Sequence, residues 1–576
     1  MDVREPVNGN RESREGAPAV SRDPKSVLSS RQSIALFGFF ALIGFVLLQP
    51  ALHGAFINDD FPLILNHPYV NPVNAENLIA ILDPFGPAML HGVNYAPVQL
   101  LVHALERLAF GDDTFGYHVV NVLVHALNSV LLVALLCRSG VPLLGAVLGG
   151  VVFTVHPTNI EVVAWMSQLK TSLALAACMG AVLAHGRFPK LATTLFVVGL
   201  LSKASAATAL PWAAALCWAR GSPRRDWAWL GVWLLLFALF AVPELEAHRS
   251  EGGVDVAAFS DVRVHVQTIG AIGARYLMMA ATSIGVSAFQ EPDPVLSSTD
   301  PWWIAGVIAA LLFAWRTVAT LRARSEEAAY WIAAGASYLP ISQISPFLHP
   351  MADRYLYFVL PGLIGGTLLA AQELRSRWLA VGDERTSKRR AIVASWATRV
   401  AIAASVVVII GFSARSHARA SLWQQEFLLV RDSAVHFPRG GTASYWRAVV
   451  AAQRGDVETT VSELRAALDR GLGFVRDFSN DPAFIQVRSH ESFHRLIDDV
   501  ALQWIAHAQS HQLKTQPWLR SVATAYLVRG EYDEAIDYFE RSARVGGPLQ
   551  AVVLSEMEAA RAERREALRA KLTEDH

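Results

Sequence analysis

The chain has 576 residues, of which 53% are hydrophobic and only 17% are charged. Soluble proteins carry about a quarter charged residues, and here the charges fall between long apolar runs. This pattern excludes a single soluble globule and a disordered chain, and it indicates a polytopic membrane protein. Lys+Arg and Asp+Glu both number 50, so the net charge gives no reason to expect nucleic acid as a partner.

The N-terminal segment 1–32 is polar, without a hydrophobic pattern, and predicts a disordered cytoplasmic tail. The first apolar run, 34–52, has no small-residue cleavage site, so it predicts a membrane anchor and not a removed signal peptide. Run 191–218 is too long for one span and predicts two short crossings or a re-entrant hairpin. The other apolar runs of roughly spanning length are 117–137, 142–155, 168–185, 227–243, 302–316, 328–345, 355–372 and 397–413.

The distribution of basic residues gives an orientation, because loops on the cytoplasmic side are enriched in Lys and Arg. If the N-terminus is cytoplasmic, segment 264–290 must not cross the membrane fully. About eleven transmembrane helices then result, with the C-terminal part outside. The inside loops of this layout hold Arg138, Arg187, Lys190, Arg220, Arg224, Arg225, Arg316, Arg322, Arg324, Arg375, Arg377, Arg385, Lys388, Arg389 and Arg390.

The transmembrane part, 33–413, is followed by 414–576, which has the pattern of a soluble helical domain. Residues 517–547 carry aromatic and small residues at tetratricopeptide (TPR) spacing, and 441–472 form a weaker copy. The alternative is a generic helical bundle. Either structure provides a surface for binding or support, and this part of the sequence contains no catalytic cluster.

The first outer loop, 53–116, begins with an adjacent pair of acids, Asp59 and Asp60. At a membrane surface, burial and mutual repulsion raise the pKa of one carboxyl group, which can then act as a general base on an acceptor hydroxyl. The alternative is two solvated loop acids. The pair could also hold a divalent cation, so the sequence leaves a metal cofactor open. Further along, Tyr95 precedes an amphipathic segment that suits a helix in the membrane interface or a packed loop helix.

The later outer loops add more ionisable and aromatic side chains. Lys203 falls at the turn of the 191–218 hairpin, where it either anchors the chain at the interface or holds a phosphate. Arg354 either pairs with Asp353 or grips a phosphate by two parallel hydrogen bonds. The remaining candidates for supporting or substrate-binding roles are His156, Glu161, Lys170, Glu291 and Tyr355.

Six short segments in order resemble a known family. They read INDDFPLILNHPYV (57–70), YAPVQLL (95–101), GYHVVNVLVHALN (116–128), FTVHPTNIEVVAWMSQLK (153–170), LSKASAATALP (201–211) and DRYLYFVLPGL (353–363). Their order is similar to that in the transmembrane and TPR-containing O-mannosyltransferases and their bacterial relatives, within the GT-C glycosyltransferase superfamily. The resemblance runs from about residue 53 to 372, and the C-terminal repeats agree in kind.

The resemblance implies a GT-C fold and a polyprenyl- or dolichyl-phosphate sugar as donor. By position, Asp59 and Asp60 match the acidic motif of the first outer loop, Glu161 an acid in the HP-containing loop, and Arg354 a basic residue in the late loop. The chain departs from the family at three places. It has Ala204 after Lys203 where Lys-Glu is common, Ala96 before Pro97 where Arg-Pro is frequent, and Lys170 where Arg is usual.

The sequence therefore predicts an inverting, multi-pass glycosyltransferase of the bacterial inner membrane, with its C-terminal domain in the periplasm. Asp59 or Asp60 would be the base, and Arg354 and Lys203 would stabilise the departing phosphate. The sugar, with mannose as the candidate, would pass to an acceptor hydroxyl, most simply a protein Ser or Thr. An acceptor protein or glycan would be recruited by the TPR-like domain. A non-catalytic scaffold for envelope assembly and a lipid or small-molecule transporter are the alternatives.

Overall fold

The computed structural model describes residues 28–86, 88–89, 94–249, 261–344, 350–380, 384–471, 478–479, 481–510, 516–546 and 549–574. Most of the predicted tail, 1–32, lies outside the described residues. Within these ranges the regular structure is helical, and the only β pairing is an isolated bridge between Gln290 and Met351. The all-α fold class is confirmed for this part of the chain.

Six helices in the described part are long and apolar enough to cross a membrane. On α13, for example, Leu311 and Trp315 are both more than 60% exposed, as expected for side chains that face lipid. The chain is thus an all-α membrane protein. The six are built on α1 (Ser30–Leu48, continued by a short turn), α5 (Thr114–Arg138), α8 (Leu169–Ala184), α11 (Arg224–Arg249), α13 (Pro301–Arg322) and α16 (Glu384–Ala420).

Shorter helices account for the difference from the predicted eleven crossings. A bent pair, Leu143–Thr154 (α6) with Pro157–Ala164, makes a seventh span if it is counted as one, with an angle of 51° at the break. Helices of 12 residues, such as α14 (Glu327–Tyr338), extend about 18 Å, which is less than the apolar core of a bilayer. The exact number of crossings therefore stays a prediction. Helix α15 (Leu360–Ala380) follows α14 in the chain and packs against it.

The long apolar run 191–218 is two helices, α9 (Pro189–Leu200) and α10 (Ala209–Arg220), joined by an irregular turn that contains Lys203. This agrees with the predicted hairpin. Both helices pack against α8, and the joining turn packs against α8 and α9. The chain reversal therefore brings Lys203 beside the start of α8.

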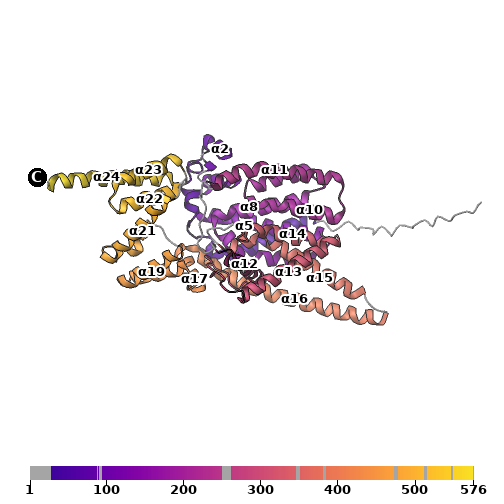
Figure 1. Cartoon of the computed structure of the whole chain (residues 1–576). Helices are drawn as coiled ribbons and strands as arrows, with labels where there is room; N and C mark the ends of the chain where they lie inside the picture. Colours follow the sequence, from indigo (N-terminus) through magenta and orange to yellow (C-terminus); the bar gives the residue numbers. More distant parts are fainter. Residues whose placement is uncertain are drawn as a thin grey trace, which may run out of the picture.

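The C-terminal helices lie at one end of the bundle (Figure 1), which we call the C-domain end. The first outer loop is at this end, because the amide of Ala55 donates to Gln424 O at 3.1 Å. The opposite end gathers predicted inside residues: Arg220 pairs with Glu326 at 2.8 Å, and Arg316 with Glu327 at 2.7 Å. The structure thus separates these inside residues from the outer loop as the positive-inside argument expects.

Helix α12 (Val262–Thr282) corresponds to the segment predicted not to cross. It is long enough to do so, at about 31 Å. Its polar contacts, however, are with segments near the C-domain end. His265 bonds to Gln343 O at 2.7 Å, and the Tyr276 hydroxyl accepts from the amide of Ala352 at 3.0 Å. These contacts support the prediction that this helix stays at one end of the bundle.

The C-terminal domain consists of helices that pack in sequential pairs. The two segments predicted as repeats form the pairs α18–α19 and α22–α23, each with a left-handed glycine, Gly455 or Gly530, in its turn. Ala535 and Phe539 are fully buried in the second pair. The helical pairing agrees with the prediction. The assignment of these pairs to the TPR family remains a prediction. The helices are α17 (Glu426–His436), α18 (Gly441–Ala452), α19 (Val457–Asp469), α21 (Glu491–Ser510), α22 (Gln516–Val528), α23 (Tyr532–Val545) and α24 (Gln550–Glu574).

Candidate active site

The two adjacent acids of the first outer loop have different environments. Asn58 adopts a left-handed conformation, with φ of 45°, and turns the chain just before them. Asn tolerates this conformation better than most residues because its short amide can bond locally. As a result Asp59 is exposed and Asp60 is fully buried. Asp59 is therefore the acid that a substrate can reach.

Asp60 fixes the loop to the body of the protein. One carboxylate oxygen accepts from the amide of Ile57 at 3.0 Å, and the other from the amide of Ser167 at 2.8 Å. Burial raises the pKa of Asp60 to about 7, although the two amide hydrogen bonds oppose the rise. Because both oxygens already accept a backbone N–H, Asp60 is a positioning group in this structure.

A second layer of polar contacts lies behind Asp60, on helix α4 (Pro97–Phe110). Gln99 donates to the carbonyl of Ser167 at 2.9 Å and lies 3.3 Å from His103 Nε2. The other ring nitrogen of His103 contacts Glu106 at 2.7 Å. All three side chains are buried, so the polar face of the amphipathic segment is turned inward. This is the expected arrangement for a helix whose outer face meets lipid.

The segment from 155 to 168 is irregular, and polar side chains of α5 satisfy its backbone. Asn121 donates to the carbonyls of Val163 and Trp165, at 3.3 and 3.2 Å. His125 bonds to the carbonyl of Thr154 at 3.1 Å. In a membrane protein an unpaired carbonyl is costly, so these contacts stabilise the breaks between the short helical turns of this segment. The motif 116–128 therefore serves to shape the neighbouring segment.

The irregular segment presents Glu161 to Arg354. The carboxylate of Glu161, 1% exposed, accepts from the Arg354 guanidinium and, at 2.8 Å, from the Arg354 backbone amide. The guanidinium carbon lies 5.6 Å from the ring centre of Trp165 and 5.0 Å from that of Tyr355. Burial lowers the pKa of Arg354, but the charges of Glu161 and Asp59 outweigh burial and raise this pKa above its ordinary value. Asp59 is thus close enough for its charge to act on Arg354.

Lys203 joins the same cluster from the turn between α9 and α10. Its ammonium donates to the Thr171 hydroxyl at 2.9 Å. Burial, together with the positive charges of Lys170 and Arg354, lowers the pKa of Lys203 to about 7. An anion bound here would restore the proton, which is the behaviour expected of a phosphate site.

The structure also separates some of the predicted residues from this cluster. Glu291 lies against the C-terminal domain, where it accepts from the backbone amide of Thr442 at 3.2 Å. His156 is fully buried and uses both ring nitrogens, toward Ala280 O at 3.0 Å and the hydroxyl of Thr158 at 2.8 Å. Both are therefore structural here, although each was predicted as a supporting residue.

Tyr95 lies at the edge of the cluster. Its hydroxyl donates to Leu82 O at 2.8 Å, and its backbone amide donates to Glu244 at 2.9 Å. Glu244 in turn favours the charged form of Lys203. Tyr95 is thus connected to the cluster through its backbone and not through its hydroxyl.

Sequence reasoning missed several contributors. Trp165 lies within the quoted motif 153–170, but nothing in its spacing marks it as the ring under Arg354. Gln99 and His103 are four residues apart on the helix face opposite the leucines, and this spacing could have marked them as a polar pair. The described residues contain no group of three or more His, Cys, Asp or Glu side chains that could hold a metal ion.

The fold and this cluster define a class: a polytopic membrane protein with an acid and several basic groups gathered at one end of its helical bundle. Comparison with known proteins is in line with this description. Over 209 residues the chain is 29% identical to the protein O-mannosyl-transferase Tmtc1 of Drosophila melanogaster. The alignment covers 34% of this chain and 24% of Tmtc1, so the chain spans about a quarter of that relative.

A scan against known protein families finds no match. The similarity to Tmtc1 supports, as a distant relation, the resemblance seen in the motifs. The activity, the donor, the acceptor and the mechanism of this chain are therefore matters for a proposal.

Proposed function

We propose that this protein is an inverting membrane glycosyltransferase. It transfers a sugar, with mannose as the first candidate, from a polyprenyl phosphate to an acceptor hydroxyl at the C-domain end. The observation that carries this proposal is the convergence of Asp59, Arg354 and Lys203 from three distant parts of the chain. Arg354 is bound to Glu161 and Lys203 to Thr171 at the start of α8, while the charge of Asp59 raises the pKa of Arg354 and the charge of Arg354 lowers the pKa of Lys203. An acid beside two phosphate-compatible cations matches the needs of a phosphate-linked donor.

In the proposed reaction Asp59 is the general base. The acceptor oxygen attacks the anomeric carbon of the sugar and its proton passes to Asp59, while the bond from that carbon to the phosphate oxygen breaks. The bonding electrons leave with the phosphate, which needs charge stabilisation more than a proton. Arg354 and Lys203 supply positive charge to this group, and Lys170 adds to the same field.

The other side chains position these groups. Glu161 orients Arg354 through the guanidinium and the backbone amide, and the rings of Trp165 and Tyr355 both contact the guanidinium. Asp60 fixes the turn that carries Asp59. This arrangement supports Asp59 over Asp60 as the base, because only Asp59 is exposed.

We place the reaction on the outer face of a bacterial inner membrane, with the C-terminal domain in the periplasm. The separation of the Arg220 and Arg316 ion pairs from the site supports this orientation. In this arrangement the polyprenyl chain lies among membrane lipids, and the helical pairs of the C-terminal domain recruit the acceptor. Protein Ser or Thr is the simplest acceptor.

The test is sugar transfer from a mannosyl-phosphoryl polyprenol by the purified protein in lipid nanodiscs. We expect Asp59→Asn to lower the rate by about 10²- to 10⁴-fold, the usual contribution of a general base, and Asp59→Glu to retain part of the activity. Asp112→Asn, at an exposed acid of the same loop, should not change it.

Equal rates for Asp59→Asn and the wild type would remove Asp59 from the mechanism. Absence of transfer by the wild type from any polyprenyl-phosphate sugar would favour the scaffold. The reaction as proposed uses no metal ion, so EDTA should have no effect; loss of activity on EDTA treatment would contradict this part of the proposal.

A further inference from the structure

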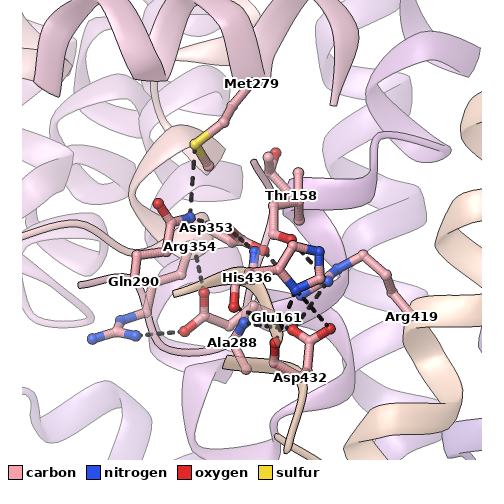
Figure 2. A network of polar contacts seen from close by, with 12 residues as sticks. Thr158, Glu161, Met279, Ala288, Gln290, Asp353, Arg354, Arg419, Asp432 and His436 are labelled. Carbon is pink, nitrogen blue, oxygen red and sulfur yellow. Dashed lines mark hydrogen bonds and ion pairs between the residues drawn. The ribbon is translucent and has the colours of Figure 1, made fainter. Parts of the chain in front are cut away.

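A buried arginine connects the candidate active site to the C-terminal domain. Arg419 is at the end of α16, and its guanidinium reaches two carboxylates from different parts of the protein (Figure 2). Its Nη2 lies 3.2 Å from Asp353, and its Nη1 lies 3.4 Å from Asp432. Asp353 immediately precedes Arg354, whereas Asp432 belongs to α17, the first long helix of the C-terminal domain.

A loop of the membrane domain is held between the same two carboxylates. The amide of Ser287 donates to Asp353 at 3.3 Å, and its hydroxyl donates to Asp432 at 3.2 Å. The amide of Ala288 also donates to Asp432, at 3.2 Å. The side chain of Gln290 reaches Asp353 as well, so the loop cannot move without disturbing both acids (Figure 2).

The three side chains of this contact are buried, so losing one of them should be strongly destabilising. The side chains of Asp353, Arg419 and Asp432 are 1%, 7% and 10% exposed. Two carboxylates share one guanidinium, so removing the arginine takes away the cation that both buried acids contact and leaves Asp432 only the imidazole of His436, at 3.4 Å. Breaking a buried ion pair from one side is far more disruptive than losing a surface pair.

The geometry also shows how a change at α17 would reach the phosphate-binding group. Asp353 and Arg354 are neighbours in the single helical turn Asp353–Tyr357. Arg419 holds the first of them, and Glu161 holds the second through its backbone amide. A shift of Asp353 therefore moves the backbone on which the Arg354 guanidinium depends, and small misplacements at a reacting centre cost large factors in rate.

We infer that Arg419 is a positioning residue that couples the C-terminal domain to Arg354, so that the placement of α17 sets the geometry of the donor-phosphate site. The C-terminal domain is then part of the catalytic structure as well as a surface for acceptors. The role of Arg354 in this inference rests on the proposed function, whereas the coupling between the two parts of the chain does not.

The test compares Arg419→Gln, Arg419→Lys and a control at a more exposed ion pair, Arg447→Gln, in the full chain in nanodiscs. Arg447 pairs with Glu463 at 2.7 Å within the C-terminal domain and so controls for loss of an arginine ion pair. Hydrogen–deuterium exchange of segment 351–359 reports the coupling, and the KM for a mannosyl-phosphoryl polyprenol reports its effect on the donor. The KM for the acceptor is measured in parallel.

We expect Arg419→Gln to speed exchange in 353–357 and to raise the donor KM about tenfold, while the acceptor KM stays within about twofold, since the effect passes through Arg354. Arg419→Lys keeps the charge but not the fork that spans two acids, and should give an intermediate result. Arg447→Gln should change neither measurement. Unchanged exchange in 353–357, or equal effects of Arg419→Gln and Arg447→Gln, would overturn the inference.

If Arg419→Gln does not fold, Asp432→Asn replaces it, because this change removes only the C-domain half of the contact and leaves the pair of Arg419 with Asp353. It should also speed exchange in 353–357, and a failure to do so would refute the coupling. Absence of transfer by the wild type would overturn the proposed function alone, and the exchange comparison would still decide the inference.

Discussion

The two ends of the helical bundle use charge differently. At the end opposite the C-terminal domain, arginines pair with glutamates of neighbouring helices, as Arg220 does with Glu326 and Arg316 with Glu327. At the C-domain end, Arg354 has Glu161, but Lys203 donates to the neutral hydroxyl of Thr171. The pKa of Lys203 falls to about 7 as a result of burial and of the neighbouring positive charges.

This contrast teaches what separates a structural from a functional cluster. Matched pairs at helix ends fasten the helices and gain nothing from a ligand. A cluster of buried cations with too few negative partners is different: it becomes more stable when an anion binds. The predictions below test whether the two ends really differ in this way.

The largest expected difference is between two buried glutamates, Glu161 at the C-domain end and Glu327 at the opposite end. Each is 1% exposed and paired with an arginine. We expect Glu161→Gln to lower the free energy of unfolding by about 3 kcal/mol, because it leaves Arg354 without its acidic partner. Glu327→Gln should cost less, because Arg316 keeps its second ion pair, with Glu373 at 3.1 Å. Only Glu161→Gln should also lower the transfer rate, by about 10²-fold, since in the proposed function Arg354 and not Arg316 binds the donor phosphate.

Thermal unfolding and transfer rates of both variants in the same nanodiscs check this comparison. The ratio of activity to folded protein is the decisive quantity, because it removes the shared loss of stability. Equal ratios for the two variants would mean that the two ends do not differ in function.

The next largest effect concerns Lys203. Its protonated fraction falls as the pH rises through the pKa of about 7. Donor affinity should therefore fall between about pH 6 and about pH 8, while the same rise in pH deprotonates no arginine. Lys203→Ala should weaken donor binding by about 10- to 100-fold, the usual worth of one charge-assisted hydrogen bond, and remove this pH dependence.

Binding of a mannosyl-phosphoryl polyprenol to each variant across this pH range measures the effect. Lys203→Arg should keep its affinity at high pH. Lys190→Ala, at a predicted inside loop, provides the control and should behave as the wild type. A pH profile of donor binding that is the same for Lys203→Arg and the wild type would show that another group titrates.

The sequence predicted the fold of this protein more fully than its candidate site. Hydropathy alone predicted the membrane fold and the hairpin turn at Lys203, because apolar run lengths follow bilayer thickness. It did not fix the number of crossings, since α14 is shorter than a bilayer and the bent pair Leu143–Thr154 with Pro157–Ala164 can be counted as one span or as none.

For the site, residue type and order predicted that Asp59 and Arg354 would share one end, but not how each side chain is used. Asp60 is next to Asp59 and has the same chemistry, yet it is buried and accepts two backbone amides. Glu291 carries the expected charge and lies at the expected end of the bundle, but it accepts a hydrogen bond from Thr442 of α18 and does not join the cluster. Such differences depend on which backbone groups lack partners, which spacing along the chain does not reveal.

The smallest expected effect tests the turn that separates the two acids. Asn58 is in the left-handed region, so Asn58→Ala should cost about 1 kcal/mol of stability from backbone strain, whereas Asn58→Gly should cost little. If the turn only joins two segments, activity should follow stability in both variants. If it directs Asp59 outward while Asp60 stays bound to Ser167, Asn58→Ala should lose more activity than stability, because the exposed carboxylate is then displaced. Comparing transfer rates with unfolding midpoints for the two variants separates these outcomes, and parallel losses would show that the difference between the two acids does not depend on this turn.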